Sequence, residues 1–173
     1  MIEQDEIERK FLIKSFLPEC EWPVAYADSV ITQIYLYNHG LTERLRRRLY
    51  VDTGWEELTH NRKRFVDRGH YREEERKITQ VAFDILLKAR RDPKLREIQK
   101  VRKVFTWGDL LWELDVFQVP SGVVVMEVEL LSLDVELTFP PFIQIEREVT
   151  GKKGWSNKAM AAPDWSPPLS RVD

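Results

Sequence analysis

The sequence predicts a mainly β fold in the α+β class: an antiparallel sheet closed into a barrel, with a few flanking helices. Short segments rich in β-branched and aromatic residues recur along the chain, and turn tripeptides such as Asn-His-Gly and Asp-Thr-Gly separate them. Within several segments charged residues occupy every second position, which places them on one face of a strand. The opposite faces of the later segments are apolar. Closing such a sheet would put the charged face inside, away from water.

Eight segments are predicted to be strands, because each alternates in character and ends at turn residues or prolines. They cover residues 7–13, 29–37, 43–51, 56–66, 70–77, 96–106, 110–118 and 122–131. The tripeptide Asp67-Arg68-Gly69 is short enough to join two of them as a hairpin.

Two helices are predicted outside the strands. Thr79 can cap the first, and Pro93 lies just beyond its end. Its residues at helical spacing on one face are Ile78, Ala82, Ile85, Leu86 and Ala89. Residues 132–138 are predicted to form a short second helix before two prolines. Residues 1–162 are interpreted as one domain, and 163–173, with three prolines, as a C-terminal tail forming a surface strap or a loose end.

The composition narrows the classes of partner. The net charge of -2 argues against electrostatic capture of nucleic acid or of an anionic membrane. Cys20 is the only cysteine, so an intrachain disulfide and a cysteine zinc site are excluded. The first ten residues lack the apolar core of a signal peptide, and no apolar run could span a bilayer. We therefore expect a cytoplasmic protein without a membrane partner, and leave a homodimer open.

Two carboxylates in an apolar strand are the main indication of a binding site. Glu127 and Glu129 stand within the strongly apolar run 123–131, where buried charge is costly unless a cation meets it. Carboxylates two residues apart on a strand can share a hard cation such as Mg²⁺ or Mn²⁺. Half-buried strands with solvated charged faces are the structural alternative for any single pair.

Clustered cations complete the pattern. Arginine forks and lysine amines are the natural partners of phosphate oxygens. A site with both signs of charge suits a metal-bridged phosphate chain, in which acids hold the metal and cations neutralise the remaining charge. The charged residues predicted to share one inward face are Glu6, Glu8, Lys10, Arg44, Arg46, Arg48, Lys63, Glu73, Glu75, Lys100, Arg102, Glu113, Asp115, Glu127 and Glu129.

The order of these motifs resembles that of a known family. Glu6-Ile7-Glu8-Arg9-Lys10 has the Glu-x-Glu-x-Lys signature of CYTH domains, also called triphosphate tunnel metalloenzymes. The resemblance runs from about residue 6 to residue 161. It continues through the motifs Gln33-Ile34-Tyr35-Leu36, Arg44-Leu45-Arg46, Lys63, Glu73-Glu74-Glu75, Lys100-Val101-Arg102, residues 112–117, Glu127-Val128-Glu129, Glu148-Val149-Thr150 and Asn157-Lys158-Ala159.

The resemblance implies an eight-stranded barrel with a tunnel through it. It implies that Glu6, Glu8, Glu127 and Glu129 ligate Mg²⁺ or Mn²⁺. It also implies that phosphates are held by Lys10, Arg44, Arg46, Lys63, Lys100 and Arg102, with Arg46 and Arg48 as an equally suitable pair. Glu73 and Glu75, together with Lys10 as a catalytic residue, would position a second metal or the attacking water. Glu113 and Asp115 would be further acids of the tunnel.

One position departs from the family pattern. Tyr71 stands where members often have an arginine, and Arg68 or Arg72 is the candidate replacement, the latter only if a bulge shifts the register. His39, His60 and His70 show no metal-ligand spacing and are expected on the surface or in loops.

The resemblance implies a small-molecule triphosphate as the partner. The leading hypothesis is a metal-dependent phosphohydrolase that cleaves the terminal phosphoanhydride of inorganic triphosphate, with thiamine or nucleoside triphosphates as further candidates. One alternative is a class IV type adenylyl cyclase acting on ATP. Another is a non-catalytic module that binds polyphosphate or nucleotide. The single nucleic-acid ligand retained is an RNA 5′-triphosphate end.

Overall fold

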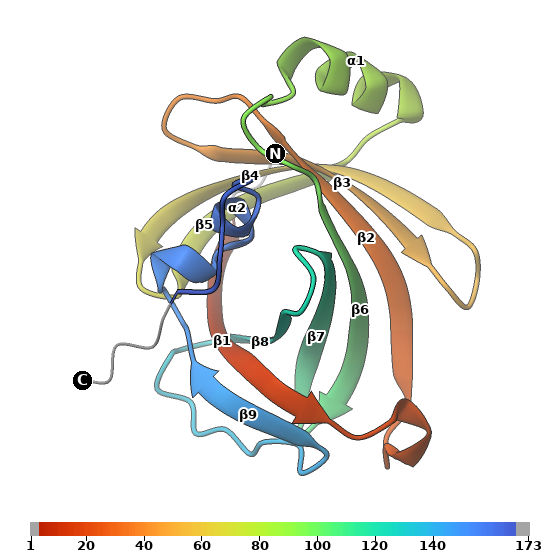
Figure 1. The fold of residues 1–173 in the computed structure, drawn as a ribbon, viewed down its shortest axis with the longest axis vertical. Coiled ribbons are helices and arrows are strands. Elements are labelled where there is room, and N and C mark those ends of the chain that lie inside the picture. The colour runs from red at the N-terminus through yellow and green to blue at the C-terminus, as the bar shows by residue number, and fades with distance from the viewer. Residues whose placement is uncertain (1–3, 169–173) are drawn as a thin grey trace.

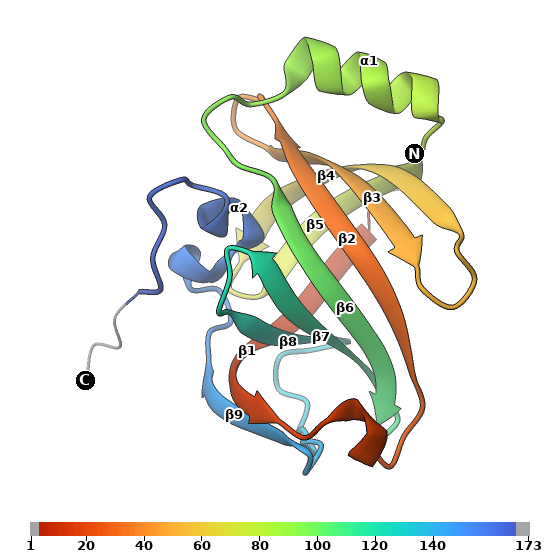
Figure 2. The same cartoon turned by 45° about the vertical axis from the view of Figure 1, so that its right-hand side comes forward.

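The computed structural model describes residues 4–168 and contains one antiparallel sheet of nine strands (Figures 1 and 2). Helix α1 (Gln80–Arg90) and the short helix α2 (Asn157–Met160) flank the sheet. Residues 19–21 and 153–155 form single 3₁₀ turns. The strands are β1 (Gln4–Phe16), β2 (Tyr26–Leu36), β3 (Thr42–Tyr50), β4 (Glu56–Asp67), β5 (His70–Lys77), β6 (Ile98–Trp107), β7 (Leu110–Val119), β8 (Val124–Leu130) and β9 (Ile143–Glu148).

The first eight strands close into a barrel, as predicted. Their order is β5-β4-β3-β2-β6-β7-β8-β1, and β1 pairs again with β5 to complete the ring. This closure rests on the start of β1, where residues 4–7 pair with residues 70–73. Residues 7–12 of the same strand pair with β8, and residues 11–16 pair with β9. The sequence prediction did not include β9, which lies outside the ring as an additional strand.

Two apolar clusters fix the walls of the barrel. On the outer side, Phe11, Trp112 and Met126 are buried beneath Phe142, which the segment before β9 supplies. This arrangement explains the apolar faces that alternate with charges on β1, β7 and β8, because those faces are covered by protein. A second cluster joins inward residues such as Phe117 to residues of the C-terminal segment, among them Trp155 and Met160. The C-terminal segment is therefore packed on the barrel.

Helix α1 is confirmed, and its predicted apolar face is right in part, since Ile78 and Leu86 pack against buried residues. The Thr79 hydroxyl accepts a hydrogen bond from the Ala82 amide at 3.3 Å and caps the helix. Phe83 is buried against Ile34, Leu36 and Leu45, whereas Ile85 is 62% exposed. Within residues 4–168, neither helix has the length and apolar character needed to cross a bilayer.

The second predicted helix, over residues 132–138, is wrong. These residues form turns and extended backbone, in which Val135 and Leu137 pack on the outer apolar cluster. An isolated helix of two turns is unfavourable to nucleate, so packing of the extended segment decides its conformation. Of the predicted tail, residues 169–173 lie outside the described part. The Trp165 indole donates to the Gly154 carbonyl at 2.8 Å, and its ring lies 5.8 Å from the Trp155 ring.

The β4–β5 hairpin is held against β1 by a glycine. Gly69 has a φ of +66°, and a Cβ there would lie 2.8 Å from the carbonyl oxygen of Glu8. The Glu8 amide donates to the Gly69 carbonyl at 2.8 Å. Only a residue without a side chain permits this close approach. The contact places the hairpin beside the Glu-x-Glu motif.

Candidate functional site: a charged cavity inside the barrel

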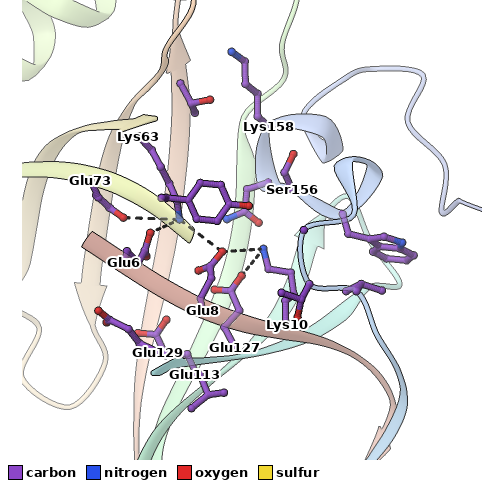
Figure 3. Close-up of a pocket in the computed structure, with 18 of the residues that line it drawn as sticks. Glu6, Glu8, Lys10, Lys63, Glu73, Glu113, Glu127, Glu129, Ser156 and Lys158 are labelled. Carbon is purple, nitrogen blue, oxygen red and sulfur yellow. Dashed lines mark hydrogen bonds and ion pairs between the residues drawn. The ribbon is translucent and has the colours of Figure 1, made fainter. Parts of the chain in front are cut away.

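A cavity of about 1250 Å³ lies within the barrel and holds most of the predicted charged residues (Figure 3). Figure 3 shows the labelled acids gathered around the amines of Lys10 and Lys63. The predicted site residues that line the cavity are Glu6, Glu8, Lys10, Arg44, Arg46, Lys63, Glu73, Arg102, Glu113, Glu127 and Glu129. The closed sheet therefore brings acids and cations from β1, β3, β4, β5, β6, β7 and β8 into one enclosure.

Strand register places the acids directly opposite one another. Glu8 pairs across β1 and β8 with Glu129, and Glu113 pairs across β7 and β8 with Glu127. Like charges directly opposite on neighbouring strands are destabilising. Such pairing persists only where cations compensate it, so the register itself indicates a cation-binding wall.

Lysine amines now supply part of this compensation. Lys10 Nζ lies 2.7 Å from a Glu127 oxygen, and Lys63 Nζ lies 2.5 Å from Glu6 and 3.7 Å from Glu8. Burial lowers the pKa of Lys10, but attraction by Glu127 outweighs it, so the pKa is raised. The corresponding attraction by Lys10 holds the pKa of Glu127 well below its ordinary value despite burial. Both groups are charged at neutral pH.

Arg102 links two sides of the cavity. Its guanidinium donates to both oxygens of Asp115 at 2.7 Å and to Glu127 at 3.2 Å, and it also pairs with Glu113. Asp115 is fully buried and pairs with Lys100 as well. Asp115 and Lys100 do not line the cavity, so Lys100 is not placed to hold phosphate as the resemblance implied; Asp115 holds Arg102 in place and pairs with Lys100. Burial and repulsion by Arg102 lower the pKa of Lys100 to about 8.

Two acids of the cavity, Glu129 on β8 and Glu6 on β1, have raised pKa values. Burial, followed by repulsion from Glu113 and other acids, raises the pKa of Glu129. Burial likewise raises the pKa of Glu6, by more than attraction of Lys63 lowers it. Lys63 Nζ lies within 4.0 Å of three carboxylates, those of Glu6, Glu8 and Glu73, and so occupies the place of a bound cation.

This donor set fits a hard divalent cation. Carboxylate oxygens are the ligands that Mg²⁺ and Mn²⁺ prefer, and a cation would relieve the repulsion that raises the pKa of Glu129. In the present arrangement, with Lys10 and Lys63 bound to the acids, no three acidic, histidine or cysteine side chains among residues 4–168 converge into a metal site. The acids therefore fit a divalent cation by their chemistry, and binding it requires Lys10 and Lys63 to leave these carboxylates.

Unpartnered donors mark the opposite wall, and one belongs to a residue whose role the sequence did not indicate. Tyr35 is 2% exposed and lines the cavity, yet its hydroxyl has no hydrogen-bond partner. The Nε atoms of Arg44 and Arg46 are also buried without a partner. Unsatisfied buried donors are costly, and three around one cavity indicate a polyanionic ligand. Tyr35 shares its strand face with Gln33, so alternation could have identified it.

Besides Lys100 and Asp115, two further predicted residues, Arg48 and Glu75, do not line the cavity. The Arg48 guanidinium donates to Ser29 Oγ at 3.0 Å and lies 4.7 Å from the Tyr50 ring centroid. The Glu75 side chain is 37% exposed and pairs with Arg46 at 3.2 Å. Both follow the predicted alternation, but they lie beyond the end of the enclosed space, which strand periodicity alone does not locate.

At position 71, where the sequence departs from the family pattern, the structure shows which side chain faces the cavity. Tyr71 lines the cavity, and its ring centroid lies 4.2 Å from Lys63 Nζ. Arg72 faces outward and pairs with Asp5 at 3.5 Å, and Arg68 is 68% exposed beside Glu148. A bulge that would turn Arg72 inward is not seen, because the register irregularity falls on β4, between Phe65 and Asp67, and β5 is regular. Neither arginine reaches the cavity.

Sequence reasoning missed Lys152 and Lys153 of the C-terminal segment, and it named Lys158 within a family motif without giving it a role. Lys152, Lys153 and Lys158 line the cavity beside Ser156. Their position depends on the packing of the segment after β9 onto the barrel, which no local pattern encodes. Thr150 anchors this segment, because its hydroxyl accepts from the Lys10 amide at 3.0 Å.

The expectation that all three histidines lie on the surface or in loops is wrong for His60. It is 3% exposed on β4, where its Nε2 lies 2.6 Å from a Glu43 oxygen. Glu43 is itself 1% exposed. His60 is buried because this partner satisfies it away from the cavity, on the side that faces α1.

Two crystal structures of NE1496, one of them described as an inorganic triphosphatase, are similar to this chain over nearly its whole length. They are 31% and 30% identical, with TM-scores of 0.59 and 0.58, and cover 94% of this chain and 99% of theirs. The PH1819 protein from Pyrococcus horikoshii OT3 shares the fold, at 16% identity and a TM-score of 0.55 over 75% of this chain and 80% of its own. No family model and no curated protein matches the sequence. With the closed barrel, its charged cavity and this relationship to NE1496, the chain belongs to the CYTH, or triphosphate tunnel metalloenzyme, family.

Proposed function

We propose that this protein hydrolyses the terminal phosphoanhydride of a triphosphate, with inorganic triphosphate as the first substrate. One observation carries the proposal: a single enclosed cavity holds repelling carboxylates on one wall and unpartnered cationic donors on the other. Only a ligand that is both polyanionic and metal-bound satisfies the two walls together. The name of NE1496, an inorganic triphosphatase 30% identical to this chain, supports the same substrate.

The chain's own residues bind and orient the substrate. Arg44 and Arg46 donate to phosphate oxygens, and the Tyr35 hydroxyl donates to the oxygen that lies between them and Lys10. Lys10 and Lys63 exchange their present carboxylate partners for phosphate oxygens. Arg102 needs no such movement, because buried Asp115 already holds it.

Mg²⁺ or Mn²⁺, held by Glu6, Glu8, Glu127 and Glu129, would supply neutralisation and polarisation of the phosphate oxygens. Glu73 is placed to orient the attacking water. Burial raises its pKa, but attraction by Arg44 outweighs this and keeps it ionised, and Arg44 lies 3.5 Å away. The water oxygen bonds to the terminal phosphorus, the bond to the bridging oxygen breaks, and pyrophosphate, phosphate and one proton are released.

The test measures phosphate release from inorganic triphosphate with Mg²⁺ or Mn²⁺. We expect Glu8→Gln and Glu129→Gln each to lower turnover by at least about 100-fold, because even residues that only support metal ligands contribute 10–100-fold. Glu146→Gln is the matched control, since Glu146 lies on β9 outside the cavity and pairs with Arg147 at 3.0 Å. Chelation should abolish activity, and either metal should restore it. Full activity in both cavity variants would exclude the proposal.

A class IV type adenylyl cyclase would use the same cavity, with the ribose 3′-oxygen of ATP as nucleophile. Chromatography of the products from ATP separates the reactions, since a cyclase yields cyclic AMP and pyrophosphate whereas a hydrolase yields ADP and phosphate. A non-catalytic module would bind triphosphate with metal and release nothing. We also infer a cytoplasmic location, because the single cysteine, Cys20, is free and exposed, as is typical of a protein in a reducing compartment.

A further inference from the structure

An uncharged aromatic ring stands among the acids and cations of the cavity. Tyr71 lines the cavity from β5, at the position where the sequence departs from the family pattern. It lies opposite Glu6 of β1 and opposite Phe65 of β4 in the strand register. Burial raises the pKa of its phenol above the ordinary value of about 10, so the side chain is neutral at physiological pH. Tyr71 therefore acts in the cavity through its ring or its hydroxyl and not through charge.

The face of this ring contacts the amine of Lys63. Lys63 Nζ lies 4.2 Å from the Tyr71 ring centroid, well within the roughly 6 Å over which an aromatic face attracts a cation. The Lys63 side chain is 15% exposed, so the contact is largely shielded from water, which strengthens it. Phe65 packs against Tyr71 with ring centroids 5.9 Å apart and planes at 71°, and so fixes the orientation of the ring.

Lys63 has several acids to choose from. Its Nζ lies 2.5 Å from Glu6, 3.7 Å from Glu8 and 3.9 Å from Glu73, and Figure 3 shows these carboxylates on different sides of the amine. A lysine amine is a point charge on a flexible four-carbon stem, so three acids by themselves do not hold it in one place. The contact with a fixed ring restricts the amine to one part of the cavity wall.

Such restriction favours ligand binding. A lysine that is mobile in the free protein loses rotamer freedom when a ligand immobilises it, and holding it beforehand removes much of this cost. The ring attracts the ammonium through its face and takes up none of the carboxylates, so Lys63 can change its acidic partners for phosphate oxygens while the ring contact persists. An arginine at position 71 would instead repel Lys63, since both side chains carry positive charge.

We propose that Tyr71 is a positioning residue for triphosphate binding: its ring holds the Lys63 ammonium at the cavity wall, where the amine can exchange carboxylate oxygens for phosphate oxygens. The inference rests on the proposed triphosphate site and adds a residue that acts through Lys63 rather than on the substrate. At position 71 a cation that would contact phosphate directly is thus replaced by a ring that orients the neighbouring cation.

A double-mutant cycle of Tyr71→Leu and Lys63→Met tests this role, with calorimetry in Mg²⁺ measuring the affinity for inorganic triphosphate. Tyr71→Leu should weaken binding about 5–30-fold, which corresponds to the loss of a shielded contact between a cation and a ring. Tyr71→Phe keeps the aromatic face and should retain the affinity of the parent. In the Lys63→Met background, Tyr71→Leu should cause no further loss, because the ring then has no cation to hold.

Tyr26→Leu is the matched control. The Tyr26 ring centroid lies 5.0 Å from Lys103 Nζ, but neither of these residues lines the cavity. The variant removes a contact of the same kind between a tyrosine and a lysine, and it should leave the affinity for triphosphate unchanged. Thermal melting of every variant verifies folding.

Three results would overturn the inference. The first is an equal loss in Tyr71→Phe and Tyr71→Leu, which would assign the role to the hydroxyl. The second is a loss in Tyr71→Leu that is just as large in the Lys63→Met background, and the third is a Tyr71→Leu variant that binds as tightly as the parent. Phosphate release is assayed separately, so a parent that binds triphosphate without cleaving it would reject the proposed hydrolysis and leave the role of Tyr71 to be decided by the cycle.

Discussion

The buried carboxylate of Glu43 joins helix α1 to the barrel wall, and Glu43→Gln tests how much stability this junction contributes. Arg90 at the end of α1 donates to both oxygens of Glu43, at 2.8 and 2.7 Å. His60 lies 2.6 Å from the same carboxylate, and Asn38 donates to it at 2.5 Å. The variant removes the anion and leaves Arg90 without its buried partner.

Removing one partner of a buried ion pair costs about 3–5 kcal/mol of unfolding free energy. For a chain of this length that loss corresponds to a melting temperature lower by about 6–20 °C. Burial raises the pKa of Glu43, but hydrogen bonds from Arg90, His60 and Asn38 outweigh it and lower the pKa from its ordinary 4.5 to about 2. Because the folded pKa is below the unfolded one, this stabilisation is complete above about 4.5 and is lost as the pH falls towards 2.

Urea denaturation of the parent and of Glu43→Gln should therefore show a full difference at pH 7 that narrows between pH 4.5 and pH 3. Glu56→Gln is the matched control on the neighbouring strand: its carboxylate is 40% exposed and lies 3.5 Å from Arg47, so it should cost less than about 1 kcal/mol. The reasoning fails if Glu43→Gln costs no more than the control, or if its cost is the same at pH 7 and pH 3.

Three further outcomes are expected. Asp115→Asn removes the carboxylate that pairs with buried Lys100 and one of the three that pair with Arg102, and should cost about 3–5 kcal/mol in urea denaturation, several times the loss in Glu113→Gln, whose carboxylate is 30% exposed. Gly69→Ala should lower the melting temperature by more than Gly54→Ala, because both have positive φ but only Gly69 has backbone 2.8 Å from the added Cβ. Tyr35→Phe should leave the free energy of unfolding unchanged or higher, because the hydroxyl has no partner. Calorimetry of the same variant should show weaker binding of inorganic triphosphate. Equal affinity would exclude a role for the hydroxyl.

Alternation in the sequence was sufficient to predict much of the charged wall. Glu6, Glu8 and Lys10 share one face of β1, and the structure directs that face into the cavity. The period of two is a property of the strand backbone and holds wherever a strand forms. Which positions lie within the enclosed length is a property of the whole barrel, and Arg48 and Glu75 followed the period without lining the cavity.

The sequence by itself determined the strands, their polar and apolar faces, and the capped helix that Thr79 begins, because these follow from local periods and turn chemistry. Only the tertiary structure decided the closure through residues 4–7 of β1, the register that sets Glu8 opposite Glu129, and the arrival of Lys152 and Lys153 at the cavity. These features depend on contacts between residues far apart in the chain. A local pattern carries no information about which distant segment will cover it.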